Sequence, residues 1–351
     1  MKQIAIFQRD LTIGGIQKSL VNLLNNINYK KYNVDLYLFG KGEFFNQLPD
    51  KVNVIMLEDE TKFVKIRNFD SLYKKVNLNI LDKEYDISID FNGYDKLTSI
   101  GALKANAKKK VVWIHNDINI KYGEEFKFKV IFNTSKSKYK YFDEVVCVST
   151  GVKEAFNIMT KLITNYKVIP NYINTKEILE KADEPIDFKV DEDKLNLVCL
   201  GRLVHQKGYD LLMPIIKELS TIRTDFHLYM IGDGPDEEDL KKQVNDLGIS
   251  EYVTFMGSKK NPYPYLKLMD ALVFNSRYEG QGMVLLEGAC LGLQIVMPHH
   301  LEKYCDGIEG VDSVLSTLRR LEKVDKKIDK LNKYNKEITK NLEELFGEVD
   351  E

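Results

Sequence analysis

Two basic residues lie in a short glycine loop in the second half of the chain. Arg202 follows Gly201, directly after an apolar run at 195–200 that predicts a strand, and Lys207 precedes Gly208 and the next helical pattern. Open α/β sheets bind ligands at the carboxyl ends of their strands, so both side chains are expected to point into that crevice. Arginine can fork onto two phosphate oxygens and lysine acts as a point charge, so both would stabilise the negative charge on a departing diphosphate. Basic side chains on an ordinary surface loop are the competing interpretation.

Two carboxylates and two glycines follow a later strand, expected at 271–274. Gly280 and Gly282 lie where a loop turns into a helix, whose first amides form an anion site that glycine lets a phosphate or sugar approach. Glu279 lies on the loop and Glu287 lies inside the helix, so they can address different parts of one extended ligand, such as sugar hydroxyls and ribose hydroxyls. Solvated carboxylates are the alternative, but Glu287 stands in an otherwise apolar helix, where an unpaired carboxylate is costly.

These loops need a scaffold that brings strand ends together. Short β-branched or aromatic runs alternate with helical patterns along the chain, which predicts parallel sheets with crossover helices. Strands are expected at 4–7, 34–39, 52–57, 87–91, 111–114, 144–148 and 168–169, and again at 195–200, 226–231, 253–255, 271–274 and 294–297. Two openings of strand, glycine loop and helix, at Gly14-Gly15 and at Gly201, predict an α/β protein of two facing Rossmann-like halves.

The predicted domain boundaries follow composition. Residues 1–173 form a first domain, the acidic and weakly periodic residues 174–193 a linker, and residues 194–330 a second domain. The lysine- and glutamate-rich pattern of 311–346 predicts an amphipathic helix. Residues 331–351 are assigned to a C-terminal helix that can pack back across the domain junction.

Charge and composition limit the classes of partner. The first 173 residues carry a net charge of +8 and the remainder −10. The first half is therefore expected to face a lipid headgroup, a lipid-linked phosphate or an acidic glycan, unless these are simply solvated surface charges. Nucleic acid is not expected, because acidic residues interrupt the basic ones. Neither a signal peptide nor a membrane span is expected, and the four scattered cysteines indicate buried thiols in a reducing cytosol.

The two loops together carry a family resemblance. GRLVHQKG at 201–208 and SRYEGQGMVLLEG at 276–288 resemble the retaining, GT-B-fold glycosyltransferases of family 4, the glycosyl transferases group 1 type. Further landmarks are Gly14-Gly15, Pro170–Asn174, Gly232–Pro235 and Asn261–Tyr263. The resemblance covers essentially the whole chain and is strongest from Leu195 to Pro298.

The resemblance implies a role for each motif residue. The first domain would bind the acceptor and the second a nucleotide diphosphate sugar, with UDP favoured. Arg202 and Lys207 would grip the diphosphate, while Glu279 would hold hydroxyls of the transferred sugar and Glu287 the ribose. His115, after the strand at 111–114, would contact the donor sugar, although a histidine there is otherwise more often structural. The implied catalytic residues are Arg202, Lys207, Glu279 and His115, and the implied donor contacts are Gly15, Gly201, Arg202, Lys207, Thr254, Glu279, Gly280, Gly282, Met283, Val284 and Glu287.

The implied reaction is retaining transfer of a hexose or N-acetylhexosamine to a lipid-linked or polymer glycan acceptor, in bacterial surface polysaccharide or cell-wall glycan synthesis. The sequence contains no convincing metal-ligand spacing, so no metal or other cofactor is expected, and Arg202, Lys207 and helix amides would neutralise the leaving group. Gln281 and Pro214 depart from the family pattern and leave the donor sugar open. The alternatives are a catalytically inactive GT-B-like partner subunit and a nucleotide-sugar epimerase of related fold.

One segment of the first domain suits a lipid surface. Basic and aromatic side chains alternate at 126–129 and at 136–142, a mixture typical of membrane interfaces. Half-buried strand and helix faces are the competing interpretation. We expect a cytoplasmic protein in peripheral contact with the inner face of the plasma membrane.

Overall fold

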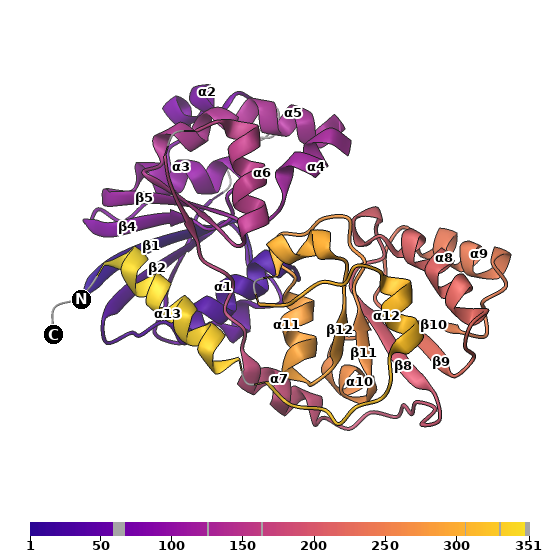
Figure 1. Ribbon diagram of the computed structural model, residues 1–351. Helices are drawn as coiled ribbons and strands as arrows, with labels where there is room; N and C mark the ends of the chain where they lie inside the picture. Colours follow the sequence, from indigo (N-terminus) through magenta and orange to yellow (C-terminus); the bar gives the residue numbers. More distant parts are fainter. Residues whose placement is uncertain (59–66, 125, 163, 306, 330, 348–351) are drawn as a thin grey trace. The chain divides into compact units, whose positions relative to one another are not determined.

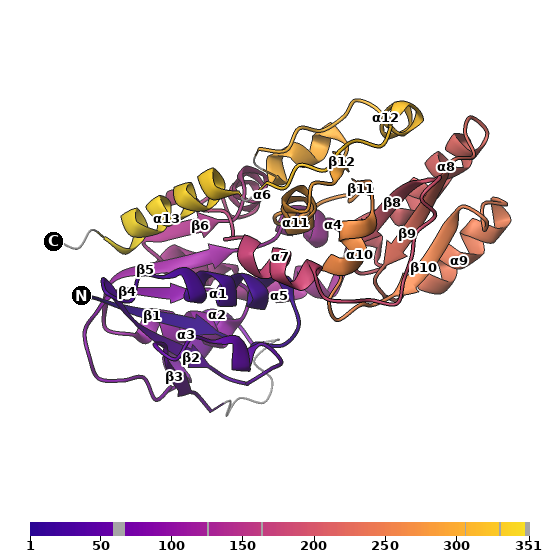
Figure 2. The ribbon, with the colours of Figure 1, turned by 90° about the horizontal axis from the view of Figure 1, so that it is seen from below.

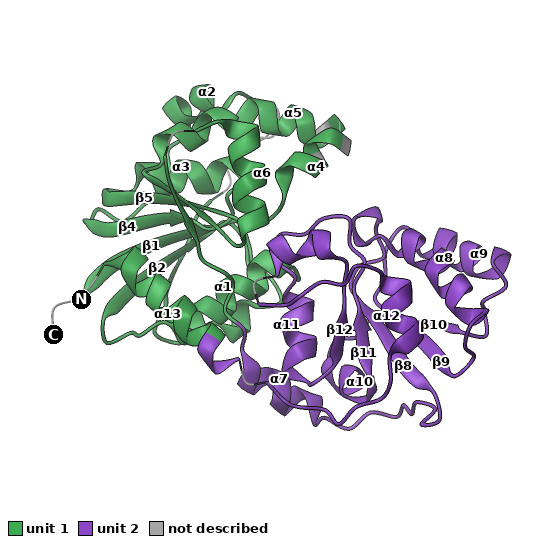
Figure 3. Cartoon of the chain, viewed as in Figure 1, with its two compact units in different colours: residues 1–172, 334–351 green, residues 173–333 purple. Residues whose placement is uncertain are grey.

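The computed structural model describes residues 1–58, 67–124, 126–162, 164–305, 307–329 and 331–347. The chain divides into two compact units, which Figure 3 colours separately. Unit 1 contains residues 1–172 and 334–351, and unit 2 contains residues 173–333.

Unit 1 is built on a sheet of seven parallel strands in the order β3-β2-β1-β4-β5-β6-β7 (Figure 1). The strands are β1 (Lys2–Gln8), β2 (Tyr32–Leu38), β3 (Asn53–Met56), β4 (Tyr85–Asp90), β5 (Ala107–Ile114), β6 (Glu144–Cys147) and β7 (Asn165–Val168). The helices are α1 (Gly15–Asn26), α2 (Phe69–Lys75), α3 (Lys96–Lys104), α4 (Ile118–Glu124), α5 (Phe126–Ser135) and α6 (Thr150–Thr160). In the central strand β1, Ile4 to Phe7 are fully buried, as expected for a parallel sheet covered on both faces.

The C-terminal helix α13 (Asn332–Phe346) returns to unit 1, as the sequence predicted; it is the yellow helix of Figures 1 and 2. The ring of Phe346 packs edge-on against Tyr32 at 5.3 Å. The hydroxyl of Tyr334 donates to the carbonyl of Asn171 at 3.1 Å. The helix prediction over 311–346 was wrong in its middle, because residues 321–329 are not helical and separate α13 from α12 (Val314–Arg320) in unit 2.

Unit 2 contains a sheet of five parallel strands in the order β10-β9-β8-β11-β12. The strands are β8 (Leu195–Leu200), β9 (Phe226–Ile231), β10 (Val253–Gly257), β11 (Ala271–Val273) and β12 (Gln294–Val296). The helices are α7 (Thr175–Ala182), α8 (Tyr209–Ser220), α9 (Glu237–Asp246), α10 (Tyr263–Leu268), α11 (Met283–Cys290) and α12. Helix α7 occupies the start of the segment expected as a linker and packs on α10 and α11.

Helix α8 continues through Pro214, one of the two residues that depart from the family pattern. A proline inside a helix cannot donate to the carbonyl four residues earlier, here that of Asp210. The side chain of Gln243 donates to this carbonyl at 3.0 Å instead. The orphaned acceptor is therefore satisfied from α9, and α8 retains its register.

Both sheets have a point where the strand order reverses. In unit 2 the chain winds from β8 outward to β9 and β10 on one side and to β11 and β12 on the other. In unit 1 the equivalent reversal lies between β1 and β4. Ligands of open α/β sheets bind at the carboxyl ends of the strands at such a reversal. A ligand is therefore expected at the loops after β8 and β11 in unit 2, or at those after β1 and β4 in unit 1.

Candidate functional site

The loop after β8 and the loop after β11 lie against each other in unit 2. The amide of Arg277 donates to the carbonyl of Gln206 at 2.8 Å. Gly208 has a φ of +63°, and a Cβ there would lie 2.2 Å from the carbonyl oxygen of Asn275. Only glycine allows this approach, so the glycine between Lys207 and α8 is what lets the two loops meet.

Lys207, in the loop after β8, and Glu279, in the loop after β11, form a largely buried ion pair. Lys207 Nζ lies 2.6 Å from Glu279 Oε1, with 17% and 8% of the respective side chains exposed. The hydroxyl of Ser276 donates to the same oxygen at 2.6 Å. Lys207 Nζ also stands over the ring of Phe274 at 5.3 Å. The structure therefore brings together two residues that the sequence predicted separately, and it adds Ser276.

Arg202 lies one residue beyond β8. Its side chain is exposed, and it has no charged partner among the residues that the structure describes. The loop after β9 packs against Gly201, the residue before Arg202, since a Cβ on Gly232 would lie 1.9 Å from the carbonyl oxygen of Gly201. Gly232 has a φ of +146°, in the region that favours glycine. This corner of the sheet thus presents one guanidinium without a charged partner in the described parts of the chain.

Glu287 lies on α11 and is half-buried. The hydroxyl of Tyr263, the first residue of α10, donates to Glu287 Oε1 at 3.3 Å. Burial raises the pKa of Tyr263 above its ordinary value, and the nearby Glu287 carboxylate adds to that rise. Tyr263 therefore remains a neutral hydrogen-bond donor that fixes one oxygen of Glu287.

The start of α11 differs in detail from the predicted anion cradle. Gly282, with φ −75° and ψ 61°, is the centre of an inverse γ-turn in which the Met283 amide donates to the Gln281 carbonyl at 2.8 Å. The Gly282 amide donates to the carbonyl of Tyr304 at 3.2 Å. The amides of Gly282 and Met283, two of the implied donor contacts, thus donate to carbonyls of the protein. A donor contact of Gly280 or Val284 stays a prediction.

Thr254 does not join this cluster. It is the second residue of β10, and its hydroxyl lies 2.8 Å from Nε2 of His227, the second residue of β9. Residues at the carboxyl end of β10, Gly257 and the following Ser258, are better placed for a ligand of the strand ends. A role for Thr254 in donor binding stays a prediction.

His115 follows β5 in unit 1 and is buried. Its Nε2 lies 2.8 Å from the carbonyl of Phe91, and its ring packs on Phe91 with centroids 4.7 Å apart. Burial lowers the pKa of His115 to about 3, so the imidazole is neutral at physiological pH. A carbonyl can only accept, so Nε2 carries the proton and Nδ1 is the acceptor nitrogen.

Gly15 is the first residue of α1, at the carboxyl end of β1. Among the described residues, no atom lies within 4 Å of a Cβ built there, and no side chain caps this helix end. The donor contact that the resemblance implies for it stays a prediction.

Part of the expected basic and aromatic surface of unit 1 is buried. Lys138 is fully buried, and its Nζ donates to the carbonyl of Asp95 at 3.1 Å. Tyr139 and Phe142 are buried as well. Burial lowers the pKa of Lys138, and the nearby Asp90 opposes that shift. Lys138, Tyr139 and Phe142 therefore do not belong to an exposed basic and aromatic surface, in agreement with the competing interpretation of half-buried faces.

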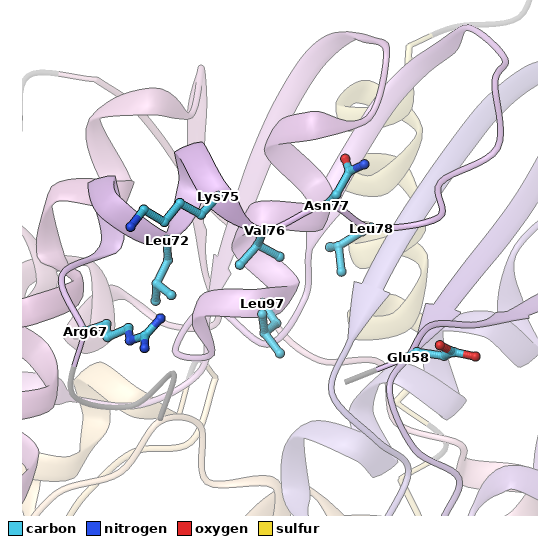
Figure 4. A pocket seen from close by; sticks show the side chains of 8 residues that line it. All are labelled: Glu58, Arg67, Leu72, Lys75, Val76, Asn77, Leu78 and Leu97. Atoms are coloured by element: carbon cyan, nitrogen blue, oxygen red, sulfur yellow. The ribbon is translucent and has the colours of Figure 1, made fainter. Parts of the chain in front are cut away.

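A pocket of about 300 Å³ lies in unit 1 near α2 and the start of α3 (Figure 4). It is lined by Glu58, Arg67, Leu72, Lys75, Val76, Asn77, Leu78 and Leu97. Leu72, Val76 and Leu97 are buried, whereas Arg67 and Lys75 are exposed. The pocket therefore combines an apolar wall with cations.

Metal ligands were not expected from the sequence. Within the described parts of the chain, no three His, Cys, Asp or Glu side chains gather in a way that suits a metal ion. Likewise, each helix in those parts is too short or too polar to span a bilayer.

Two parallel α/β units of this kind define the GT-B class of glycosyltransferases, and solved structures share the fold. HepE of Anabaena, solved in complex with UDP, superposes with a TM-score of 0.64 at 15% identity, over 98% of this chain and 99% of that one. Residues 180–304 match the family of glycosyl transferases group 1.

Sequence relatives agree with that family. An uncharacterised glycosyltransferase of Methanocaldococcus jannaschii is 23% identical over 79% of this chain and 70% of its own length. The N-acetylgalactosamine-N,N'-diacetylbacillosaminyl-diphospho-undecaprenol 4-alpha-N-acetylgalactosaminyltransferase of Campylobacter jejuni is 25% identical over 86% of this chain and 81% of its own length. The chain thus has the fold of GT-B glycosyltransferases, and residues 180–304 resemble the glycosyl transferases group 1.

Sequence reasoning missed the residues that hold the cluster in place. Ser276 and Tyr263 stand in quoted motifs, but only the fold shows that they bond the two glutamates. Arg277 and Asp210 form a forked ion pair 67 positions apart. In the sequence, Asp210 and Arg277 appear as one charged residue beside each of the two glycine loops. This pattern predicts an ion pair only once the two loops are known to be in contact.

Proposed function

We propose that the protein is a retaining glycosyltransferase that uses a UDP-sugar as donor. The observation that carries this proposal is the Lys207–Glu279 ion pair, which lies with the unneutralised Arg202 at the strand reversal of unit 2. A nucleotide diphosphate sugar needs cations for its phosphates and a carboxylate for its sugar hydroxyls, and this corner supplies both. The complex of HepE with UDP supports UDP as the nucleotide.

In this proposal, Arg202 and Lys207 stabilise the negative charge that develops on the leaving diphosphate. Glu279 accepts from hydroxyls of the transferred sugar, and its pairing with Lys207 prevents the carboxylate from repelling the phosphates. Glu287, held by Tyr263, accepts from the ribose. The acceptor oxygen bonds to the anomeric carbon on the face from which the diphosphate departs, as the bond between that carbon and the diphosphate oxygen breaks, and the departing phosphate takes the proton of the acceptor hydroxyl. Because attack and departure share one face, the anomeric configuration is retained.

We further propose that the reaction needs no divalent metal, because Arg202 and Lys207 supply the charge that a metal would otherwise provide. Transfer should therefore continue in excess EDTA. A loss of turnover in EDTA that Mg²⁺ or Mn²⁺ restores would refute this part.

The proposed acceptor is lipid-linked, with an apolar and an anionic portion, in surface polysaccharide or cell-wall glycan synthesis. The pocket of Figure 4 supports such an acceptor, because buried Leu72 and Leu97 lie close to the exposed cations Arg67 and Lys75. Arg67→Ala and Lys75→Ala should raise the acceptor KM without changing the donor KM. Lys74→Ala, an exposed neighbour that does not line the pocket, is the control.

Peripheral contact with an anionic membrane is proposed through α5. Phe126 and Val130 are 79% and 40% exposed at a spacing of four residues, so they share one face, and Lys129 beside them is exposed. Phe126→Ser should reduce co-sedimentation with vesicles that contain phosphatidylglycerol. Equal binding of wild type and variant, or binding independent of anionic lipid, would count against this contact.

The donor proposal is tested by thermal shift with a panel of nucleotides and nucleotide sugars, followed by product analysis. A ligand that prefers the folded state raises the melting temperature, and UDP-sugars should do so most. Arg202→Ala should abolish that shift, whereas Arg319→Ala, an exposed arginine on α12, should not. An axial product linkage from an axial donor, seen by NMR, would support retention. Conversion of the donor to a second nucleotide sugar without acceptor would instead identify an epimerase.

A further inference from the structure

The guanidinium of Arg277 bonds to two neighbouring segments of unit 2. Its NH1 donates to the Asp210 carboxylate and to the carbonyl of His205, each at 2.7 Å. Its NH2 donates to the second Asp210 oxygen at 2.7 Å. This forked pair holds the pKa of Asp210 below its ordinary value, with the hydrogen bond from Arg277 as the largest cause. One guanidinium therefore bonds both to the first turn of α8 and to the loop before it.

The contacts of Arg277 belong to a set that joins the two glycine loops. The amide of Arg277 donates to the carbonyl of Gln206 at 2.8 Å, and the Gln206 side chain donates back to the carbonyl of Tyr278 at 3.0 Å. The side chain of Asn275 donates to the carbonyl of Gly208 at 3.2 Å. Bonds from residues 275–278 thus reach every residue of 205–208 except Lys207, whose own side chain reaches Glu279.

We infer that Arg277 is a positioning residue of the transferase, which clamps the Lys207 loop to the Glu279 loop through Asp210. The inference rests on the proposed function, because it assigns the clamp to the site that would hold the donor diphosphate and sugar. Because the bonds between residues 275–278 and 205–208 join the two loops, the backbones of Lys207 and Glu279 can move little relative to each other. Misplacement of a catalytic group by even 1 Å can reduce turnover about 100-fold, so such a clamp bears on rate.

The geometry favours positioning over direct phosphate binding by Arg277. Its fork is matched to the two Asp210 oxygens, which is the geometry in which arginine cannot be replaced by lysine. A phosphate ligand would compete with that carboxylate for the same donors. Arg277 therefore acts through Lys207 and Glu279, whereas Arg202 is the arginine left for the ligand.

The chain contains a matched control pair. Arg223 and Asp225 form a similar forked contact, in which Nε and Nη2 of the arginine each lie 2.8 Å from a carboxylate oxygen. Arg223 Nη1 also donates to the carbonyls of Leu318 and Leu321, so Asp225→Asn is the closer of the two controls. Asp225 immediately precedes β9, so this pair lies at the amino ends of the unit 2 strands. The glycine loops lie at their carboxyl ends. Loss of either pair should affect folding in a similar way, and only loss of the Arg277–Asp210 pair should affect turnover.

The test compares Arg277→Lys, Arg277→Gln and Asp210→Asn with Arg223→Lys and Asp225→Asn, using the full chain with a UDP-sugar that it accepts. Each clamp variant should lower kcat by about 10-fold to 100-fold and change the donor KM by less than about threefold. The Arg277→Gln/Asp210→Asn double variant should be no slower than Arg277→Gln, because both changes remove one interaction. The control variants should keep wild-type kcat at temperatures well below their melting points.

Three outcomes would overturn the inference. Arg277→Lys with near wild-type kcat would show that the fork is not needed. A loss of more than 100-fold in Arg277→Gln beside a normal Asp210→Asn would make Arg277 a direct ligand. Equal losses of kcat in the control variants would show a general effect on folding.

Failure of the proposed function would be separable from failure of the clamp. If wild type accepts no nucleotide sugar, amide hydrogen exchange still reports on the clamp without any ligand. Residues 205–208 should then exchange faster in Asp210→Asn than in Asp225→Asn, and equal exchange would overturn the clamp itself.

Discussion

Replacing Glu279 by glutamine tests the buried ion pair with almost no change in side-chain shape. In wild type, Glu279 Oε1 accepts from Lys207 Nζ and from the Ser276 hydroxyl, each at 2.6 Å. The oxygen of an amide could still accept both bonds, but the amide carries no negative charge. Lys207 would then lose its counter-charge while only 17% of its side chain is exposed.

The magnitude follows from that burial. Removing one partner of a buried pair costs about 3–5 kcal/mol, and the partial exposure of Lys207 reduces the expected cost to about 2–3 kcal/mol. For a domain of this size the melting temperature should fall by about 5–10 °C. Turnover should fall by about 100-fold to 1000-fold, as for loss of one preorganised charged or donor group in other active sites.

The assay is a double-mutant cycle with Lys207→Met, followed by thermal denaturation and by initial rates of transfer. The double variant should be less destabilised than the sum of the single variants, because it contains no unpaired charge. Glu238→Gln is the control, since Glu238 pairs with Lys241 at 3.0 Å but is 87% exposed. That change should cost less than about 0.5 kcal/mol. Strict additivity in the cycle, or full activity of Glu279→Gln, would refute the reasoning.

Three further changes probe the surroundings of this pair. Tyr263→Phe removes the donor to Glu287 and should raise the donor KM about threefold to tenfold with little change in kcat, measured by initial rates. Gly208→Ala places a Cβ 2.2 Å from the Asn275 carbonyl oxygen and should lower both the melting temperature and kcat. Because the folded pKa of His115 is about 3, the unfolded chain binds its proton first as pH falls below about 6.5. Between pH 7.5 and 5, denaturant unfolding should therefore show wild type losing about 2 kcal/mol more than His115→Gln.

Most of the scaffold follows from local sequence, because buried parallel strands give apolar runs that pattern reasoning detects. Strands such as β1 and β8 lie where those runs were found. The helix expected over 311–346 failed for a physical reason. Amphipathic composition continues through 321–329, but that stretch is a non-helical connection within unit 2 between α12 and α13.

The site was only partly predictable. Its charged residues can be recognised in sequence motifs, but the residues that pair with them are brought close only by the fold. Lys207 and Glu279 stand out by motif, yet their pairing across 72 positions depends on the contact of two loops. Lys138 shows the opposite error, since a lysine in a basic run is buried beside Asp90. A single sequence does not distinguish a lysine on the surface from one that lies in the interior.

Arg202 and Lys207 are proposed to hold the diphosphate of the donor. Calorimetric titration of UDP measures the contribution of these two side chains. Wild type should bind UDP at one site, and the Arg202→Ala/Lys207→Ala variant should bind it at least about 100-fold more weakly, since each charged hydrogen bond contributes about 1.5–3 kcal/mol. Equal affinity of wild type and the folded double variant for UDP would contradict the account.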